Sequence, residues 1–307
     1  MKLLNHNISM KSRSDIFNIY PIGDAHIGAY NFATSKFKTY IQQIKNDPNG
    51  LWVGGGDILD AIILQDQKRF DPENLPDWLL SGNPNNVRCK IKDILKAQLD
   101  YAQELLEPIK DKCVGMIEGN HEYSISHYHN RDIHEDLCER LSAINLTDCA
   151  FIRFKCDRSF TNNTHAPVTA CVRLYICHGF GGGRSAGAEP THLNRLAQER
   201  DCEIILRGHS HIFHIMPPIP RLTIPSCGAL PEHAMAKEVR AANWGCWLLS
   251  YAQGPSTYDS RANYPVRPMC TVVATIKPFH EVSKASRSEK AILRANMPKI
   301  TLQEVVL

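Results

Sequence analysis

Short apolar runs that stop at polar residues alternate with longer amphipathic segments, and this pattern predicts an α/β protein. The runs that predict the main strands are residues 16–22, 51–54, 112–117, 150–156, 168–177 and 203–207. Apolar residues at helical spacing predict helices at residues 35–46, 87–109 (closed by Pro108), 131–144 and 189–200. Beyond residue 210, shorter strands are predicted at residues 221–224, 244–251 and 271–276.

Two segments depart from this alternation. Residues 58–86 contain three prolines and the turn-forming run 81–86, which predicts an irregular and partly exposed insertion. Residues 281–307 mix Lys, Arg and Ser with Leu, Ile and Val, and we expect a C-terminal tail that docks as a helix or stays mobile. The segment before it, residues 1–280, is expected to form a single domain.

Five polar strings follow the carboxyl ends of predicted strands. In chain order they are Asp24-Ala-His26, Gly56-Asp57, Gly119-Asn120-His121-Glu122, His178 and Gly208-His209-Ser210-His211. In open α/β sheets, ligands bind at this edge, so residues distant in sequence are expected to meet in one crevice. No single string is specific, but the ordered set of five is hard to obtain by accident.

The donor atoms of these strings suit two divalent cations. One set is expected to comprise Asp24, His26, Asp57 and His211. The other is expected to comprise Asp57, Asn120, His178 and His209, with Asp57 bridging the two ions. Mixed nitrogen and oxygen ligation favours Mn, Fe or Zn over Mg or Ca, and Mn is our first expectation. Two ions about 3.5–4 Å apart can share a hydroxide and clamp a phosphoryl group. His121 would then protonate the leaving oxygen, which makes His121 and Asp57 the candidate catalytic residues.

Each string also has a plainer interpretation. Asp24 and His26 in an extended segment would point to the same side, but a loop carboxylate beside a histidine is common. Asp57 follows three glycines that let the backbone approach a ligand, and it would equally suit the N-cap of a helix starting at Ile58. Taken alone, the string at 119–122 is a polar turn, and the pair of histidines at 209 and 211 faces solvent.

A glycine-rich loop follows His178. Its amides, at Gly182 and Gly183, and the guanidinium of Arg184 would suit an anion such as a phosphate. A flexible turn explains the same residues, so both interpretations stay open.

Composition narrows the class of protein. The 307 residues are 43% hydrophobic and 22% charged, a composition ordinary for a globular protein. The net charge of +3 is far below the strongly basic balance of a protein that coats DNA. None of the 11 cysteines forms a Cys-x-x-Cys pair, and Cys177 and Cys246 lie in apolar runs, as buried thiols of a cytoplasmic protein do. We see no signal peptide in residues 1–15 and no apolar run long enough for a membrane span.

The ordered strings resemble the calcineurin-like metallophosphoesterases, whose pattern is D-x-H, G-D, G-N-H-[DE], H and G-H-x-H. Here the strings read DAH, GD, GNHE, H and GHSH over residues 16–230. The resemblance implies a four-layer α/β/β/α sandwich of two mixed sheets flanked by helices. It also implies the ligand sets given above, with His121 near the leaving group. The insertion at 58–86 and the loop after His178 depart from the simplest members, which leaves the substrate open.

We therefore expect a binuclear metal-dependent phosphoester hydrolase that prefers phosphodiesters and resembles the nuclease and phosphodiesterase branches. A phosphomonoesterase acting on a small molecule is one alternative, and a scaffold that kept the fold without the chemistry is another. A nuclease acting on DNA or RNA is a special case of the phosphodiesterase. A third option is nucleic-acid binding with the hydrolase as one part of a larger repair or phage-type assembly, and it predicts a basic path to the site. The candidates for that path are Lys36, Lys38, Lys68, Arg69, Arg88, Lys90 and Lys92, which ordinary solvated helix faces would also explain.

Overall fold

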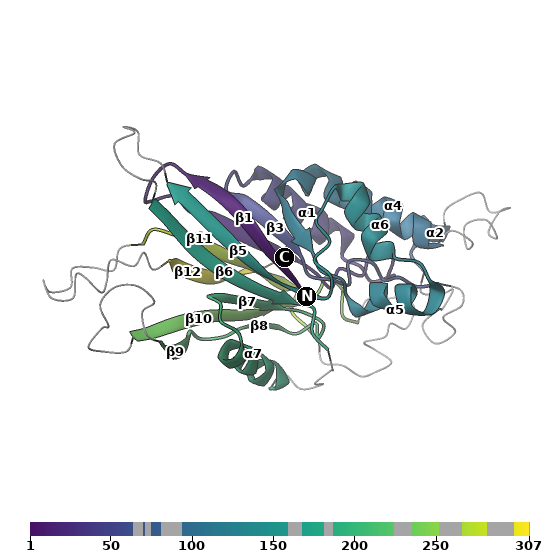
Figure 1. The fold of residues 1–307 in the computed structure, drawn as a ribbon. Coiled ribbons are helices and arrows are strands. Elements are labelled where there is room, and N and C mark those ends of the chain that lie inside the picture. Colours follow the sequence, from purple (N-terminus) through teal and green to yellow (C-terminus); the bar gives the residue numbers. More distant parts are fainter. Residues whose placement is uncertain are drawn as a thin grey trace, which may run out of the picture.

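Two β-sheets pack against each other, and helices cover their outer faces (Figure 1). The computed structural model describes residues 1–63, 70, 75–80, 94–158, 168–180, 187–223, 235–251, 266–280 and 298–306. Within these ranges, no helix is both long enough and apolar enough to cross a lipid bilayer.

The five-stranded sheet has the order β12-β11-β2-β3-β4. Its strands are β2 (Phe17–Ile22), β3 (Gly50–Gly54), β4 (Cys113–Met116), β11 (Cys270–Lys277) and β12 (Lys299–Val306). Strands β2, β3 and β4 are parallel, whereas β11 runs antiparallel to both β2 and β12. The carboxyl ends of β2, β3 and β4 therefore lie at one edge of this sheet.

The seven-stranded sheet has the order β1-β5-β6-β7-β10-β8, with β9 paired to β10. Its strands are β1 (Lys2–Met10), β5 (Cys149–Arg158), β6 (Val168–Cys177), β7 (Ile204–Arg207), β8 (Phe213–Ile215), β9 (Ile219–Thr223) and β10 (Met235–Trp244). Strands β6, β7 and β10 are parallel neighbours, which again places their carboxyl ends at one edge.

The helices lie on both outer faces. Their bounds are α1 (Thr34–Asn46), α2 (Asp77–Leu80), α4 (Ile94–Leu106), the 3₁₀ helix η3 (Glu107–Lys112), α5 (Asn120–His129), α6 (Ile133–Leu141) and α7 (Ala188–Glu199). Figure 1 shows α1, α4 and α6 together on one side of the sheets and α7 on the other.

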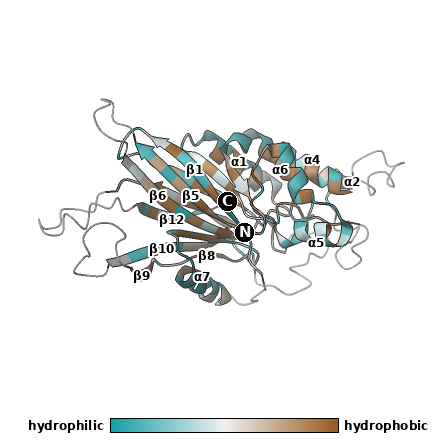
Figure 2. Ribbon diagram, in the orientation of Figure 1, coloured by the Kyte–Doolittle hydropathy of each residue, from teal (hydrophilic) through white to brown (hydrophobic). Residues whose placement is uncertain are grey.

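Three buried clusters account for this layering. Between the sheets, Ile19 and Val272 of the five-stranded sheet share a cluster with Ile152 and Leu174 of the seven-stranded sheet. Strand β5 alternates buried and outward residues, as a strand with one face in the core does, and Figure 2 shows the matching alternation of brown and teal along β1 and β5.

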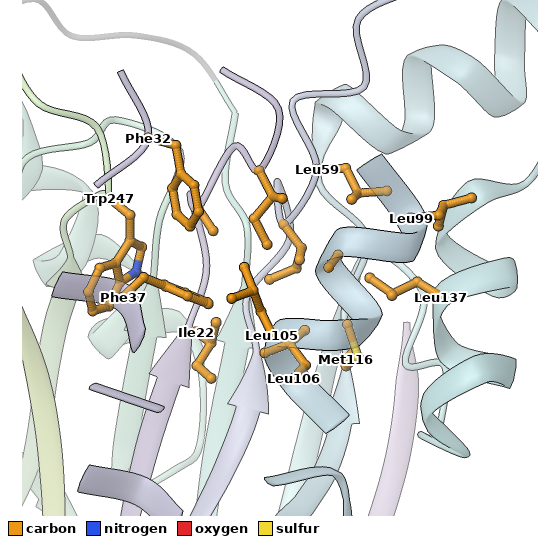
Figure 3. Close-up of a cluster of buried hydrophobic side chains, with 14 of the residues drawn as sticks. Ile22, Phe32, Phe37, Leu59, Leu99, Leu105, Leu106, Met116, Leu137 and Trp247 are labelled. Atoms are coloured by element: carbon orange, nitrogen blue, oxygen red, sulfur yellow. The ribbon is translucent and has the colours of Figure 1, made fainter. Parts of the chain in front are cut away.

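The two outer clusters attach the helices. On one side, Phe37 of α1, Leu105 of α4 and Leu137 of α6 pack with Ile22 and Met116 of the five-stranded sheet (Figure 3). On the other side, Leu193 and Ala197 of α7 pack with Ile205 and Val239 of the seven-stranded sheet. The order helix, sheet, sheet, helix confirms the expected α/β/β/α architecture.

Several predicted elements need correction. The strand predicted at 244–251 is wrong, because β10 ends at Trp244 and the chain turns at Gly245 (φ +80°). The helix predicted at 87–109 is described from Ile94 onward, and a 3₁₀ helix with Pro108 in its first turn follows α4. Strands β1, β8 and β10 and helices α2 and α5 were not predicted. In the segment 281–307, residues 299–306 form neither a helix nor a free tail but β12, which pairs with β11.

The insertion predicted at 58–86 is partly described. There the apolar side chains of Ile58, Leu59, Ile63, Leu75 and Leu79 are buried in the cluster beneath α1 and α4 rather than exposed. Residues 64–69, 71–74 and 81–86 lie outside the described ranges.

Candidate metal centre

The polar strings meet at the common edge of the two sheets. Asp24, Asp57 and Asn120 follow the parallel strands β2, β3 and β4, whereas His178 and His209 follow β6 and β7. The expectation that these positions converge at strand ends is therefore confirmed.

The first group of donors is Asp24, His26 and His211, whose donor atoms lie within 4.8 Å of one another. His211 Nε2 is 3.0 Å from His26 Nε2 and 3.3 Å from Asp24 Oδ1. Asp24 and His26 are buried. Two imidazole nitrogens and a carboxylate oxygen turned toward one point form the donor set of a transition-metal site.

The second group is Asp57, His178 and His209, again within 4.8 Å. His178 Nε2 lies 3.1 Å from Asp57 Oδ2 and 3.0 Å from Asn120 Oδ1. Asn120 Oδ1 is also 2.7 Å from His209 Nδ1, so the amide oxygen faces the same point.

Asp57 connects the two groups. Its Oδ2 is 3.1 Å from His178 Nε2 in the second group and 4.0 Å from His26 Nε2 in the first. Burial raises the pKa of Asp57, but the neighbouring His178 and His121 outweigh burial and hold it well below its usual range. Burial lowers the pKa of His178, but the facing Asp57 carboxylate outweighs burial and raises the pKa of His178 to about 9. A carboxylate held ionised between two clusters of nitrogen donors suits a bridging ligand.

The backbone of the site is held in a conformation that side-chain-bearing residues rarely adopt. Asp24, His26, Asp57, His209 and His211 all have positive φ values, between 47° and 73°. The segment 24–26 is therefore not extended. The alternation of side chains along a strand, which we inferred from sequence, does not explain why Asp24 and His26 converge. Hydrogen bonds from the amides of Asp24 and His26 to the carbonyls of Gly56 and Asp57, at 2.9 and 3.0 Å, join the two loops and sustain this conformation.

Asp57 is also not a helix N-cap, because residues 58–63, which follow it directly, form no helix. The segment 119–122 is a helix start instead of a simple turn. Asn120 is the first residue of α5, and the Glu122 carboxylate accepts the amide N–H of the N-cap residue Gly119 at 3.2 Å.

His121 lies beside the Asp57 carboxylate. Its Nδ1 is 2.8 Å from the carbonyl oxygen of Asp60, and its Nε2 is 3.9 Å from Asp57 Oδ2. A bond from Nδ1–H to the carbonyl directs Nε2 toward the centre. Its side chain is 20% exposed, whereas that of His26 is 3% exposed, so His121 faces the open side. His26, Asp57 and His121 also have donor atoms within 4.8 Å, so distance alone does not separate ligand from acid.

Several residues that position the ligands had no assigned role in the sequence analysis. Glu122 is buried and accepts the amide N–H groups of Asp57, Leu59 and Gly119 at 2.9, 2.9 and 3.2 Å. Burial and the nearby Asp57 raise the pKa of Glu122 to about 8. Asp60 Oδ1 lies 3.5 Å from His26 Nδ1, on the far side of that ring from the centre.

A buried ion pair supports the strand end that carries His209. Arg207 Nη1 donates to both carboxylate oxygens of Glu189 at 2.7 and 2.6 Å. Asn243 Nδ2 bridges Glu189 Oε2 at 2.9 Å and Ser210 Oγ at 3.0 Å. Both members of the ion pair are buried, so α7, β7 and β10 are locked together directly behind the histidines.

Other candidates are placed differently or lie outside the described ranges. Gly182, Gly183 and Arg184 are among the residues not described, so the phosphate cradle stays a prediction. Of the proposed basic path, only Lys36 and Lys38 are described; both lie on α1, where the ammonium of Lys38 sits 5.8 Å from the ring centroid of Tyr101.

The remaining histidines near the site divide into two kinds. His127 and His129 are exposed on α5, whereas His134 is buried, with Nε2 3.3 Å from the carbonyl of Met116. His134 is therefore part of the α6 packing and not a surface residue. Cys177 and Cys246 are buried free thiols, as expected.

No family model matches the chain, and no curated protein matches its sequence. Among solved structures, Vps29 of Entamoeba histolytica complexed with zinc is similar at 9% identity and a TM-score of 0.34, covering 94% of this chain and 98% of that one. A conserved predicted phosphoesterase of Streptococcus pneumoniae is similar at 10% identity and a TM-score of 0.31, covering 94% and 99%. These similarities are distant, and function has to be inferred from this chain's own side chains.

Proposed function

We propose that this chain is a binuclear metal-dependent phosphoester hydrolase with a preference for phosphodiesters. The observation that carries the proposal is the pair of donor groups that share Asp57 at the common edge of the two sheets. Bound there, two divalent cations would polarise a phosphoryl group and lower the pKa of a coordinated water.

The donors fit such ions. Asp24, His26 and His211 supply one oxygen and two nitrogens, and Asp57 completes that set. Asn120, His178 and His209 supply the other set, again with Asp57. The Nε2 atoms of His26 and His211 are 3.0 Å apart, a separation that suits two ligands of one cation and equally suits a hydrogen bond in one tautomer. Mixed N/O ligation favours Mn, with Fe and Zn as the next candidates.

His121 is proposed as the general acid. Its Nδ1 is engaged by the Asp60 carbonyl, which fixes the ring and leaves Nε2 facing the centre from the exposed side. A protonated Nε2 there would donate to the leaving oxygen of the ester.

Aromatic side chains at the rim support a substrate that carries rings, such as a nucleotide diester or a nucleic acid. Phe180 is 90% exposed, and its ring lies nearly parallel to that of His209, with centroids 6.5 Å apart and an interplanar angle of 12°. Tyr123, one helical turn from Asn120, is also exposed. Nucleobases stack on such rings with little dependence on sequence.

A monoesterase and a catalytically idle scaffold remain the competing functions. The chain retains every donor of both groups together with His121, which favours an enzyme over a scaffold. Turnover of bis-p-nitrophenyl phosphate and of p-nitrophenyl phosphate, each with Mn²⁺ and with EDTA, separates the three. We expect Mn²⁺-dependent turnover that is faster on the diester. Faster turnover of the monoester would favour a monoesterase. No turnover of either ester by the metal-loaded protein would favour the scaffold.

Two variants test the roles. His121→Ala is expected to lower kcat by about 10²–10⁴-fold while both ions stay bound, because it removes an acid and no ligand. Asp57→Ala is expected to lose at least one ion. Equal loss of metal from both variants would contradict the division between acid and ligand.

A further inference from the structure

Trp244 lies buried at the point where the ligand loops meet. It is the last residue of β10, the neighbour of β7 in the sheet, and 1% of its surface is exposed. Its indole Nε1–H donates to Asp24 Oδ2 at 2.6 Å, across 220 positions of sequence. A short bond from a buried donor to a carboxylate oxygen fixes that oxygen strongly.

The bond decides which Asp24 oxygen is left for a cation. Oδ2 accepts from Trp244, whereas the amide of His209 lies 3.1 Å from both Oδ1 and Oδ2, so only the indole distinguishes the two oxygens. Oδ1 is the oxygen that faces His211 Nε2, at 3.3 Å. With Oδ2 engaged by the protein, Asp24 presents Oδ1 to the first donor group and so acts as a ligand through one atom.

The indole ring also sets the spacing of three ligand loops. A Cβ atom at Gly23, Gly55 or Gly208 would meet atoms of the Trp244 side chain at 2.7, 2.4 and 2.2 Å. These glycines stand one or two positions before Asp24, Asp57 and His209. Only glycine allows each backbone to approach the ring this closely, so one side chain serves as the common packing surface of three strings.

We propose that Trp244 is a positioning residue of the metal centre: its N–H makes Asp24 a one-oxygen ligand, and its ring spaces the loops of Asp24, Asp57 and His209. This role rests on the proposed function, because it concerns how the same two ions would be held. Residues that orient metal ligands in this way typically change metal affinity by about 10- to 100-fold when altered.

The test compares Trp244→Phe with Trp52→Phe. Trp52 is an equally buried tryptophan whose indole N–H donates to the carbonyl of Ile109 at 2.8 Å, in the cluster between the sheet and the helices. Each change removes one indole hydrogen bond, but only the bond of Trp244 reaches a proposed metal ligand, Asp24. Mn²⁺ is titrated into each metal-free protein, and the free ion is counted by its electron paramagnetic resonance signal.

We expect two ions in the wild type and in Trp52→Phe, and an affinity about 10- to 100-fold lower for one ion in Trp244→Phe. Unchanged binding in Trp244→Phe, or equal weakening in both variants, would overturn the positioning role. Failure of the wild type to bind Mn²⁺ would instead overturn the proposed function and this inference with it.

A second measurement does not depend on the folding of Trp244→Phe. The chain has four tryptophans, so a ¹⁵N-labelled protein gives four indole N–H resonances. Substituting Trp52, Trp78 and Trp247 singly assigns the fourth resonance to Trp244 by elimination. Zn²⁺, which is diamagnetic, should shift the Trp244 signal most, because the carboxylate that accepts its hydrogen bond through Oδ2 becomes a ligand through Oδ1. If that signal stays fixed while two Zn²⁺ ions bind, the inference is wrong.

Discussion

Gly119→Ala should displace the Asp57 carboxylate, the proposed bridging ligand, without straining the backbone at residue 119. Gly119 has φ −98° and ψ 178°, which alanine adopts freely. A Cβ there would lie 2.1 Å from the amide nitrogen of Asp57 and 2.2 Å from its Oδ1. Ordinary contact needs about 1 Å more than this, and both atoms belong to a buried segment, so Asp57 has to move.

The size of the effect follows from what that movement breaks. Overpacking a buried site costs about 1–3 kcal/mol. Displacement also disturbs the bonds from the amide of His121 to Asp57 Oδ1 at 2.8 Å and from the amide of Asp57 to Glu122 Oε2 at 2.9 Å, each contributing about 1 kcal/mol or more. We therefore expect a loss of about 3–5 kcal/mol in the free energy of unfolding. A shift of about 1 Å in a catalytic group lowers kcat/KM by about 100-fold.

Gly187→Ala is the matched control, because a Cβ at Gly187 has no atom within 4 Å and its φ is −71°. It should change stability by no more than about 0.5 kcal/mol. Urea unfolding in EDTA measures the packing effect without bound metal, and turnover of bis-p-nitrophenyl phosphate with Mn²⁺ measures the effect on the site. If Gly119→Ala matches Gly187→Ala in both assays, the proposed contact between Gly119 and Asp57 is wrong.

Three further predictions use other parts of the molecule. Mn²⁺ at 100 times its Kd should stabilise the wild type by about 2.7 kcal/mol per bound ion. EDTA treatment should therefore lower the Tm, and an unchanged Tm would count against metal binding. Burial raises the pKa of Glu203, but Arg173 and Lys237 outweigh burial and lower this pKa. The ion pairs of Glu203 therefore stabilise the fold at neutral pH. Their contribution is lost as the pH falls through the folded-state pKa of Glu203. Glu203→Gln should therefore cost about 2 kcal/mol at pH 7, with the difference from wild type shrinking below about pH 4; a difference independent of pH would refute this linkage. Phe180→Ala should raise KM several-fold for a dinucleotide but not for dimethyl phosphate, and equal changes for both substrates would exclude stacking at Phe180.

The positions of the candidate ligands were predictable because they depend on local rules. Apolar runs such as 16–22 and 203–207 are buried strands, and parallel strands bring their carboxyl ends to one edge whatever lies between them. The structure brings Asp24, His26 and His211 together in one group of donor atoms and Asp57, His178 and His209 in another. It also groups His26 and Asp57 with His121, which the expected ligand sets left out.

Two of the missed elements, strand β1 and helix α5, have a weak apolar pattern. Strand β1 lies at a sheet edge, and His6 occupies an inward position between Leu4 and Ile8, so its alternation is diluted. Helix α5 buries only Glu122 and Ile125 among its side chains, and a helix with so few buried positions shows no apolar periodicity.

The supporting residues of the site were not predictable, because their roles exist only in the folded chain. Trp244 reads as one more apolar residue in a hydrophobic run, and nothing near it in sequence indicates a bond to Asp24. The same holds for the buried pair of Arg207 and Glu189. The run 244–251 predicts a strand, but a short apolar sequence is equally typical of a buried turn, so the pattern does not distinguish the two.

The central claim is that two cations share Asp57 between the two donor groups. Crystals grown with Mn²⁺ and measured for anomalous scattering test it directly. The account predicts two peaks about 3.5–4 Å apart, one among Asp24, His26 and His211 and one among Asn120, His178 and His209, with Asp57 contacting both. Fully occupied crystals with no peak at these side chains, or with a single peak that Asp57 does not touch, would contradict it.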